Sequence, residues 1–273
     1  DNILDFLSDG FEIKRHSLSG SLSTYFYPNE TTKIFLDLST GFRAPNIDDL
    51  GKVFIKDQFL TVPNSQLVPE YAYNFSLGIS KKIDFKNIQF SFSSTSFFTI
   101  LDNVITKQNL EINGSSLIYY DSNYYEILAN QNSEIGIVYG LSGSVSITFL
   151  KNLRFHSSLC YTRGTLKYTQ VPMSHIPPLF GKLNLNYTFK KLEFQILNNF
   201  NAEKINKLFG QGNTDNPLEA SPMGYPSWWV INTQVGYQYK ESLKLSLGLY
   251  NLLDVHYKTF ASGISAPGRS LMV

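Results

Sequence analysis

Strict alternation of apolar and polar residues is the feature that most constrains this chain, and it is clearest between residues 32 and 81. In residues 34–42, one set of alternate positions holds Ile34, Leu36, Leu38, Thr40 and Phe42, and the other holds Phe35, Asp37, Ser39 and Gly41. Residues 71–80 alternate in the same way. Successive side chains of a β-strand point to opposite faces, so both runs predict strands with one apolar face and one polar face. The polar residues 44–69 between them predict a long loop.

The same alternation recurs along the whole chain, with turn-forming residues between the runs. It predicts further strands at residues 17–27, 88–101, 132–149, 153–161, 183–189, 192–196, 229–239 and 243–253. Two more long polar loops are predicted at residues 102–130 and 203–226. Short connections of about two to five residues therefore alternate with long ones of about 12 to 29, an asymmetry typical of transmembrane β-barrels and rare in soluble sandwiches.

Composition narrows the class of protein further. The charged fraction is 16%, aromatic residues make up 15%, and the net charge is +1, so nothing indicates a nucleic-acid partner or a polybasic membrane patch. Opposite the apolar rows lie amides and charges that a dry core would not accept: Asn184, Asn186, Glu193, Gln195, Asn232, Gln234, Lys244 and Ser246. The pattern predicts an all-β, antiparallel transmembrane barrel. The alternative is an antiparallel sheet of a soluble protein with one wet face.

Three sequence motifs lie where the predicted strands meet the long loops. Residues 41–46 read GFRAPN and are followed by Ile47-Asp48-Asp49-Leu50. Residues 63–70 read PNSQLVPE, immediately before the second alternating run. Residues 249–254 read LYNLLD, followed by Tyr257 and by Pro267-Gly268-Arg269. In order and spacing these motifs resemble the corresponding segments of TonB-dependent outer-membrane receptors. The sequence before the last predicted hairpin is similar to that of receptors from Bacteroidetes-type bacteria.

The resemblance implies a barrel of 22 strands closed by an N-terminal plug, with residues 1–273 forming the C-terminal portion of the barrel, about eleven strands. The plug and the TonB box would lie outside this chain. The chain opens without a basic and apolar leader and stops inside an expected strand, so we expect a fragment. The resemblance also implies the outer membrane of a Gram-negative bacterium, with Leu36, Leu38, Phe75 and Leu77 facing lipid and Asp37, Arg43 and Asn74 facing the lumen.

The function implied by the resemblance is the capture of a scarce nutrient chelate, such as a siderophore–iron or cobalamin-like complex. Import follows when the TonB–ExbB–ExbD complex pulls on the plug. Two other classes remain as alternatives: a passive porin-type barrel, and a soluble or surface β protein that acts in adhesion. We expect no enzymatic activity, because no nucleophile elbow, zinc-protease motif, P-loop or dinucleotide fingerprint occurs. No cofactor is expected.

Three charged residues of the first motif are candidate ligand contacts: Arg43, Asp48 and Asp49. Arg43 falls on the polar face, where a plug carboxylate or a lumen aspartate is its expected partner. The adjacent aspartates suggest calcium, but such pairs are common in loops. Structural roles are the stronger expectation for the motif as a whole, since Pro45 and Pro69 end or begin strands and Gly268 permits unusual backbone.

Four tyrosines of the second long loop, Tyr119, Tyr120, Tyr124 and Tyr125, are the other candidate ligand contacts. Aromatic side chains suit planar or aromatic chelates. The competing interpretation is that they pack the loop itself or belong to the interfacial girdle.

Histidines and the single cysteine, Cys160, indicate no further site. His16, His156, His175 and His256 are scattered without metal-site spacing, and we expect surface or lumen positions for them. Haem-importing members of the resembled family carry a histidine between their two boxes, and residues 44–69 contain none. The haem hypothesis therefore loses its main support. Cys160 is expected to be a small residue within a strand.

Overall fold

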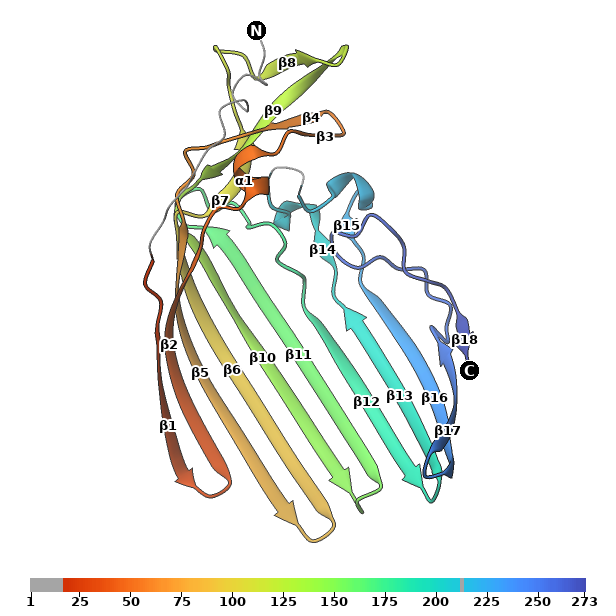
Figure 1. The fold of residues 1–273 in the computed structure, drawn as a ribbon. Coiled ribbons are helices and arrows are strands. Elements are labelled where there is room, and N and C mark those ends of the chain that lie inside the picture. Colours follow the sequence, from red (N-terminus) through yellow and green to blue (C-terminus); the bar gives the residue numbers. More distant parts are fainter. Residues whose placement is uncertain (1–16, 212–213) are drawn as a thin grey trace.

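A computed structural model describes residues 17–211 and 214–273, and its main feature is one large curved sheet (Figure 1). The sheet has eleven strands, each paired with the next one along the chain once the strands of the long loops are set aside. They are β1 (Ser21–Asn29), β2 (Thr32–Arg43), β5 (Glu70–Phe85), β6 (Ile88–Asp102), β10 (Gly136–Phe149), β11 (Leu153–Leu166), β12 (Phe180–Phe189), β13 (Leu192–Asn201), β16 (Trp228–Lys240), β17 (Leu243–Tyr250) and β18 (Ser270–Met272). All ten pairings are antiparallel, so the all-β architecture of about eleven strands is confirmed.

The apolar rows predicted from the sequence continue from strand to strand on one face of this wall. Leu38 lies opposite Phe75, Phe75 opposite Phe98, and Phe98 opposite Tyr139. These four side chains remain between 41 and 44% exposed, because the wall has no second layer on this face. A continuous apolar face of this extent is stable only against an apolar environment.

The opposite face of the wall is polar and satisfies its groups by cross-strand hydrogen bonds. Asn74 lies between Ser39 and Thr99 in the register, and the Thr99 hydroxyl donates to Asn74 Oδ1 at 2.8 Å. Ser93 and Ser144 share a hydrogen bond of 2.8 Å. Cys160 lies within β11, as expected, opposite Ser142 of β10, and is a free thiol.

The two ends of the wall differ as the sequence predicts. At one end the strand pairs are joined by two or three residues, for example residues 86–87 and 190–191. Lys86 and Lys190 begin these turns in the left-handed region, with φ of 44° and 53°. At the other end the connections are long, and they gather over the edge of the wall (Figure 1).

Two of the long connections fold together into a second sheet, the loop sheet. It consists of β3 (Phe54–Lys56), β4 (Phe59–Val62), β7 (Ile105–Asn109), β8 (Leu117–Tyr120) and β9 (Asn123–Asn132), with β9 at its centre. The parallel pairing of β4 with β9 unites the two connections. The prediction that residues 102–130 form only a polar loop is therefore wrong. That segment contains Ile127, Leu128 and Ala129, which gain β4 as a partner that no local pattern announces.

The loop sheet carries the best-buried apolar cluster of the described residues. Leu60, Val62, Ile127 and Ala129 are at most 5% exposed and pack together on one face of the sheet. Close by, the five-residue helix α1 (Ile47–Gly51) buries Leu50. The core of this chain therefore lies at the loop end and not within the wall.

The remaining connections form a compact rim beside the loop sheet. The short strands β14 (Lys204–Ile205) and β15 (Gly224–Tyr225) pair there, next to the 3-10 turns η2 (Asn206–Leu208) and η3 (Pro217–Glu219). The rings of Phe209, Tyr225 and Phe260 contact one another with centroids 5.5 to 5.9 Å apart. Across the described ranges, no helix has the length and apolar character needed to cross a membrane.

Candidate functional site

The first sequence motif builds a short capped helix directly after β2. Asn46 is the N-cap of α1, and its side chain accepts from the backbone N–H of Asp49 at 2.9 Å. The Asp49 carboxylate accepts from the backbone N–H of Asn46 at 3.1 Å. This reciprocal capping box satisfies N–H groups that a helix start otherwise leaves unpaired. Pro45 stands just before the cap, so the chain leaves the strand here as predicted.

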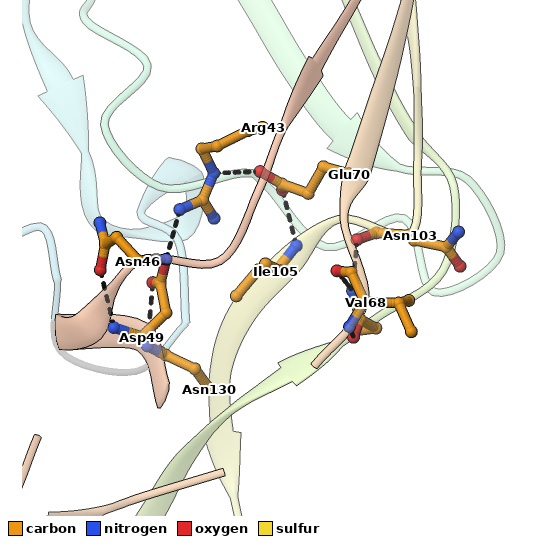
Figure 2. A network of polar contacts seen from close by, with 9 residues as sticks. Arg43, Asn46, Asp49, Val68, Glu70, Asn103, Ile105 and Asn130 are labelled. Atoms are coloured by element: carbon orange, nitrogen blue, oxygen red, sulfur yellow. Dashed lines mark hydrogen bonds and ion pairs between the residues drawn. The ribbon is translucent and has the colours of Figure 1, made fainter. Parts of the chain in front are cut away.

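Arg43 joins this helix to the wall (Figure 2). Its guanidinium donates to Asp49 Oδ2 at 2.7 Å and to Glu70, the first residue of β5. Glu70 in turn accepts from the backbone N–H of Ile105, at the start of β7, at 2.6 Å. Arg43 thus has its carboxylate partners within this chain, and one side chain ties together β2, β5, α1 and the loop sheet.

Side-chain amides extend the same network into the loop sheet (Figure 2). Asn130 donates to Asp49 Oδ1 at 3.2 Å, and Asn64 donates to the Asn130 carbonyl at 2.8 Å. Asn132 exchanges two hydrogen bonds with the backbone of Val68, at 2.8 and 2.9 Å. We call Arg43, Asn46, Asp49, Glu70 and Asn130 the polar clasp. It holds the loop sheet over the end of the wall, which supports the structural role expected for this motif.

The structure separates the two aspartates. Both carboxylate oxygens of Asp49 are occupied within the clasp, whereas Asp48 is exposed on the first turn of α1. Within the part of the chain that the structure describes, no three His, Cys, Asp or Glu side chains are grouped to hold a metal ion. The pair therefore offers no ready calcium cage.

The four tyrosines divide into two pairs on opposite faces of the β8–β9 hairpin. Tyr119 and Tyr124 face each other across the strands with ring centroids 5.1 Å apart and are 62% and 70% exposed. Tyr120 and Tyr125 are half-buried against the apolar cluster of the loop sheet. Loop packing thus accounts for one pair, and only Tyr119 and Tyr124 remain available for contact with a ligand.

The last motif closes the end of the chain onto the wall. Asn251 accepts from the backbone N–H of Val255 at 2.9 Å, and Asp254 Oδ1 accepts from the backbone N–H of Arg269 at 2.7 Å. Gly268 does not take a left-handed conformation, so the expected reason for this glycine is wrong. A Cβ at this position would instead lie 3.0 Å from Asp254 Oδ1, so close approach favours glycine here.

The histidines form no common site among the described residues, and His16 lies outside them. His156 belongs to the polar face of the wall, opposite Asn184, and His256 contacts the Ser265 hydroxyl at 3.0 Å. The backbone N–H of His175 donates to Asp215 Oδ1 at 2.7 Å. Asp215 is fully buried and also accepts from the backbone N–H of Gly210 at 2.7 Å, so it braces the rim.

Sequence reasoning missed a group of lysines on the loop sheet. Lys52, Lys56 and Lys107 come from two different connections, and the first two act electrostatically on the third. Partial burial and then these two charges hold the pKa of Lys107 below its ordinary value. No spacing in the sequence announces the group, because only the β4–β9 pairing brings its members together.

Comparison with known proteins identifies the same architecture. The family profile described as "TonB dependent receptor-like, beta-barrel" matches residues 2–252. Two curated relatives are each 22% identical to the chain: the probable hemoglobin and hemoglobin-haptoglobin-binding protein 4 of Haemophilus influenzae, over 270 residues, and the probable TonB-dependent siderophore receptor PirA of Acinetobacter baumannii, over 292 residues. These alignments cover 95% and 98% of this chain but only 27% and 36% of the relatives.

Solved structures share the fold at low sequence identity. The copper transporter OprC matches with a TM-score of 0.69 and 16% identity, covering 93% of this chain and 39% of that protein. The siderophore receptor PirA from Acinetobacter baumannii matches with a TM-score of 0.68 and 18% identity, covering 93% of this chain and 40% of that protein. The chain thus spans well under half the length of the proteins it resembles.

Proposed function

This chain belongs to the family of TonB-dependent receptor-like β-barrels, and on that premise we propose that it forms part of an outer-membrane receptor for a scarce nutrient chelate. The receptor would bind the chelate at the loop end and import it by TonB-coupled transport. One observation carries the proposal: an eleven-stranded wall with one apolar and one polar face bears an ordered loop sheet, clasped over the end where the long connections gather.

The apolar face supports a position in the membrane, with lipid at Leu36, Leu38, Phe75 and Leu77. Aromatic side chains bound this face at both ends of β16, where Trp229 stacks on Phe200 with centroids 5.5 Å apart and Tyr237 lies eight residues further on. A tilted strand of eight residues climbs roughly 20 Å, close to the height of the apolar band of outer-membrane barrels. Short turns then face the periplasm and the loop sheet faces the exterior.

The polar face supports a water-accessible lumen rather than a dry core. Glu193 and Lys244 form an ion pair of 2.5 Å on this face, and both side chains are nearly half exposed. In the proposed receptor this face surrounds the plug, and the plug carries the contact with the TonB–ExbB–ExbD complex. This chain's part is to enclose the path and to hold the loops that meet the ligand.

The nature of the chelate is constrained by both relatives and residues. The relatives' names include a siderophore receptor and a haemoglobin-binding protein. Residues 44–69 carry no histidine to ligate haem iron. The charged groups of the polar clasp pair with one another and hold the loops. We therefore favour a siderophore–iron complex or a similar chelate over haem.

Uptake by whole cells tests this function. We expect that deletion of the gene abolishes accumulation of radiolabelled iron from at least one chelate of a defined panel, and that a complementing copy restores it. Collapse of the proton gradient, or loss of TonB, is expected to abolish the same uptake. Uptake that survives both treatments would indicate a passive porin-type barrel, and normal uptake of every chelate by the deletion strain would contradict the proposal.

A further inference from the structure

Three lysines, two in the loop sheet and one just before it, lie on one face of that sheet. Lys56 is opposite Phe59 in the register, Thr61 is opposite Leu128, and Lys107 is opposite Asn130. Since alternate residues of a strand share a face, these residues share the face opposite the apolar cluster of Leu60 and Ile127. The Lys52 ammonium joins the same face, 4.9 Å from the centroid of the Phe54 ring. We call this face, with Lys52, Lys56 and Lys107, the lysine face.

The lysine face looks towards the rim and the mouth of the wall. Lys56 donates to the side chain of Asn216, which lies on the rim between β13 and β16. Lys107 lines a cavity of about 480 Å³ together with Leu166 at the end of β11, Thr169 just beyond it, and Gln211 of the rim. A volume of this order suits a small molecule.

Among the described residues these lysines have no carboxylate partner, although Glu126 shares their face, opposite Phe59. Within the described ranges, no Asp or Glu lies at ion-pair distance from Lys52, Lys56 or Lys107. Lys107 is partly buried, and the charges of the other two lysines add to the cost of its own charge. An ammonium held under these conditions is stabilised by an anion that enters the cavity.

One carboxylate, that of Glu134, lines the same cavity but is already occupied. It accepts from the backbone N–H groups of Tyr168 and Thr169 and from the Thr169 hydroxyl, the backbone bond from Thr169 measuring 3.0 Å. Desolvation alone would raise the pKa of Glu134, but the hydrogen bonds from the Thr169 hydroxyl and from the backbone N–H groups of Tyr168 and Thr169 together hold it below its ordinary value. The Glu134 carboxylate therefore holds residues 168–169 in place and does not pair with Lys107.

We propose that the lysine face and the cavity beside it dock a multiply anionic metal chelate. Lys107 supplies the central charge, Lys52 and Lys56 supply flanking charges, and the amides of Asn109 and Gln211 supply hydrogen-bond donors. The exposed Tyr119–Tyr124 pair continues the same face outward along β9, about 20 Å from Lys107 at 3.3 Å per residue. The site rests on the proposed function and assigns it a ligand class: anionic chelates in preference to neutral ones.

Two ferric complexes of similar size but different net charge show whether binding depends on the charge of the ligand or on its shape. Ferric iron held by three catecholate groups is trianionic, whereas ferric iron held by three hydroxamate groups is neutral. The complete receptor, purified in detergent, is titrated calorimetrically with each complex at low and at moderate salt. We expect tighter binding of the catecholate complex, and an affinity that falls as salt rises because exposed charges are screened.

Variants then assign the effect to the lysine face. Lys107→Gln is expected to weaken binding of the catecholate complex by roughly three- to tenfold, and Lys107→Arg to retain it, because an ion contact of this kind contributes about one power of ten or less. The Lys52→Gln/Lys56→Gln/Lys107→Gln variant is expected to lose more, together with most of the salt dependence. Lys240→Gln, an exposed lysine at the other end of the wall, is the matched control and is expected to leave binding unchanged.

Several results would overturn the lysine site. Equal affinity for both complexes, or binding of neither, would do so. An unchanged affinity in the triple variant would also do so, as would an equal loss of affinity for both complexes in a variant whose barrel still shows heat-modifiable migration. The proposed function stands or falls separately. TonB-dependent uptake of the neutral complex would leave the receptor function intact while refuting the lysine site, and the absence of energy-dependent uptake of any chelate would refute the function.

Discussion

The wall and the loop sheet are built from the same strand geometry but are stabilised in different ways. In the wall, apolar residues such as Leu77 stay exposed within the protein, and stability comes from the pairing of long neighbouring strands together with an apolar surrounding. In the loop sheet the strands are short, and Leu60 and Ile127 are buried against other side chains. The wall is stable in an apolar surrounding such as a membrane, whereas the loop sheet is stabilised by its own buried core. Substitutions of the same kind are therefore expected to act differently in the two regions.

The strongest test of this contrast removes a side chain from the core of the loop sheet. Leu60→Ala leaves a cavity at a site with no solvent exposure and is expected to cost about 2–5 kcal/mol of local stability. Limited proteolysis of intact cells is expected to cleave within residues 54–62 or 105–132 in the variant. Heat-modifiable migration in gels is expected to persist, because the wall does not depend on this core.

The matched control for Leu60→Ala is Leu245→Ala on the apolar face of β17, where the side chain is 57% exposed. This change leaves no enclosed cavity within the protein and is expected to leave both the gel migration and the loop proteolysis unchanged. If Leu60→Ala destroyed the folded wall, or if both variants behaved alike, the wall and the loop sheet would not be stabilised independently.

The next largest effect is expected from a charge on the apolar face of the wall. Leu77→Arg in the middle of β5 places a guanidinium against lipid and is expected to cost about 2–4 kcal/mol near the bilayer midplane. The amount of folded barrel in purified outer membranes measures this cost. Ser80→Arg, on the polar face of the same strand beside Ser93, is the control and is expected to insert normally. Equal losses for the two variants would show that this face does not meet lipid.

A smaller effect is expected where the two regions meet, at the polar clasp. Glu70→Gln keeps an acceptor for the Ile105 N–H but removes the charge that pairs with Arg43. Since Arg43 is 44% exposed, the loss is expected to be about 1 kcal/mol. Hydrogen exchange is expected to quicken at the amides of β7 and to stay unchanged in β10. A uniform change over both strands would mean that the clasp does not act locally.

Much of the wall follows from the sequence because its rule is local. Period-2 alternation fixes which side chains share a face, and a one-residue shift of register would turn Leu38 and Phe75 to the wet side, so the pattern also fixes the pairing. The short turns are equally local. Motifs of a few residues, such as the one ending in Asn46, identified the family, whereas the capped helix α1 was not predicted within the loop of residues 44–69.

The loop sheet does not follow from the sequence, because its defining contact joins distant segments. Residues 59–62 pair with residues 126–129, and no local pattern selects that partner. The lysine face inherits the same difficulty, since Lys56 and Lys107 meet only through β4 and β9. The β8–β9 hairpin, in contrast, has a local signal. Asp121 and Ser122, with φ of 46° and 68°, form a two-residue turn between alternating residues. Reading that turn would have divided the tyrosines into an exposed and a packed pair.

The smallest structural effect is expected at that exposed pair, where function and stability separate most clearly. Tyr124→Ala removes a ring that is 70% exposed and touches only Tyr119 among the ring contacts of the described residues, so its cost is expected to stay under about 1 kcal/mol. Tyr125→Ala, one residue further along β9 and packed on the apolar cluster, is expected to loosen the loop sheet measurably. If Tyr119 and Tyr124 extend the ligand surface, Tyr124→Ala weakens chelate binding while proteolysis of the loops stays at its normal rate. If binding is lost only in Tyr125→Ala, in step with loop proteolysis, the tyrosines serve the packing of the loop sheet and the lysine face binds the chelate without them.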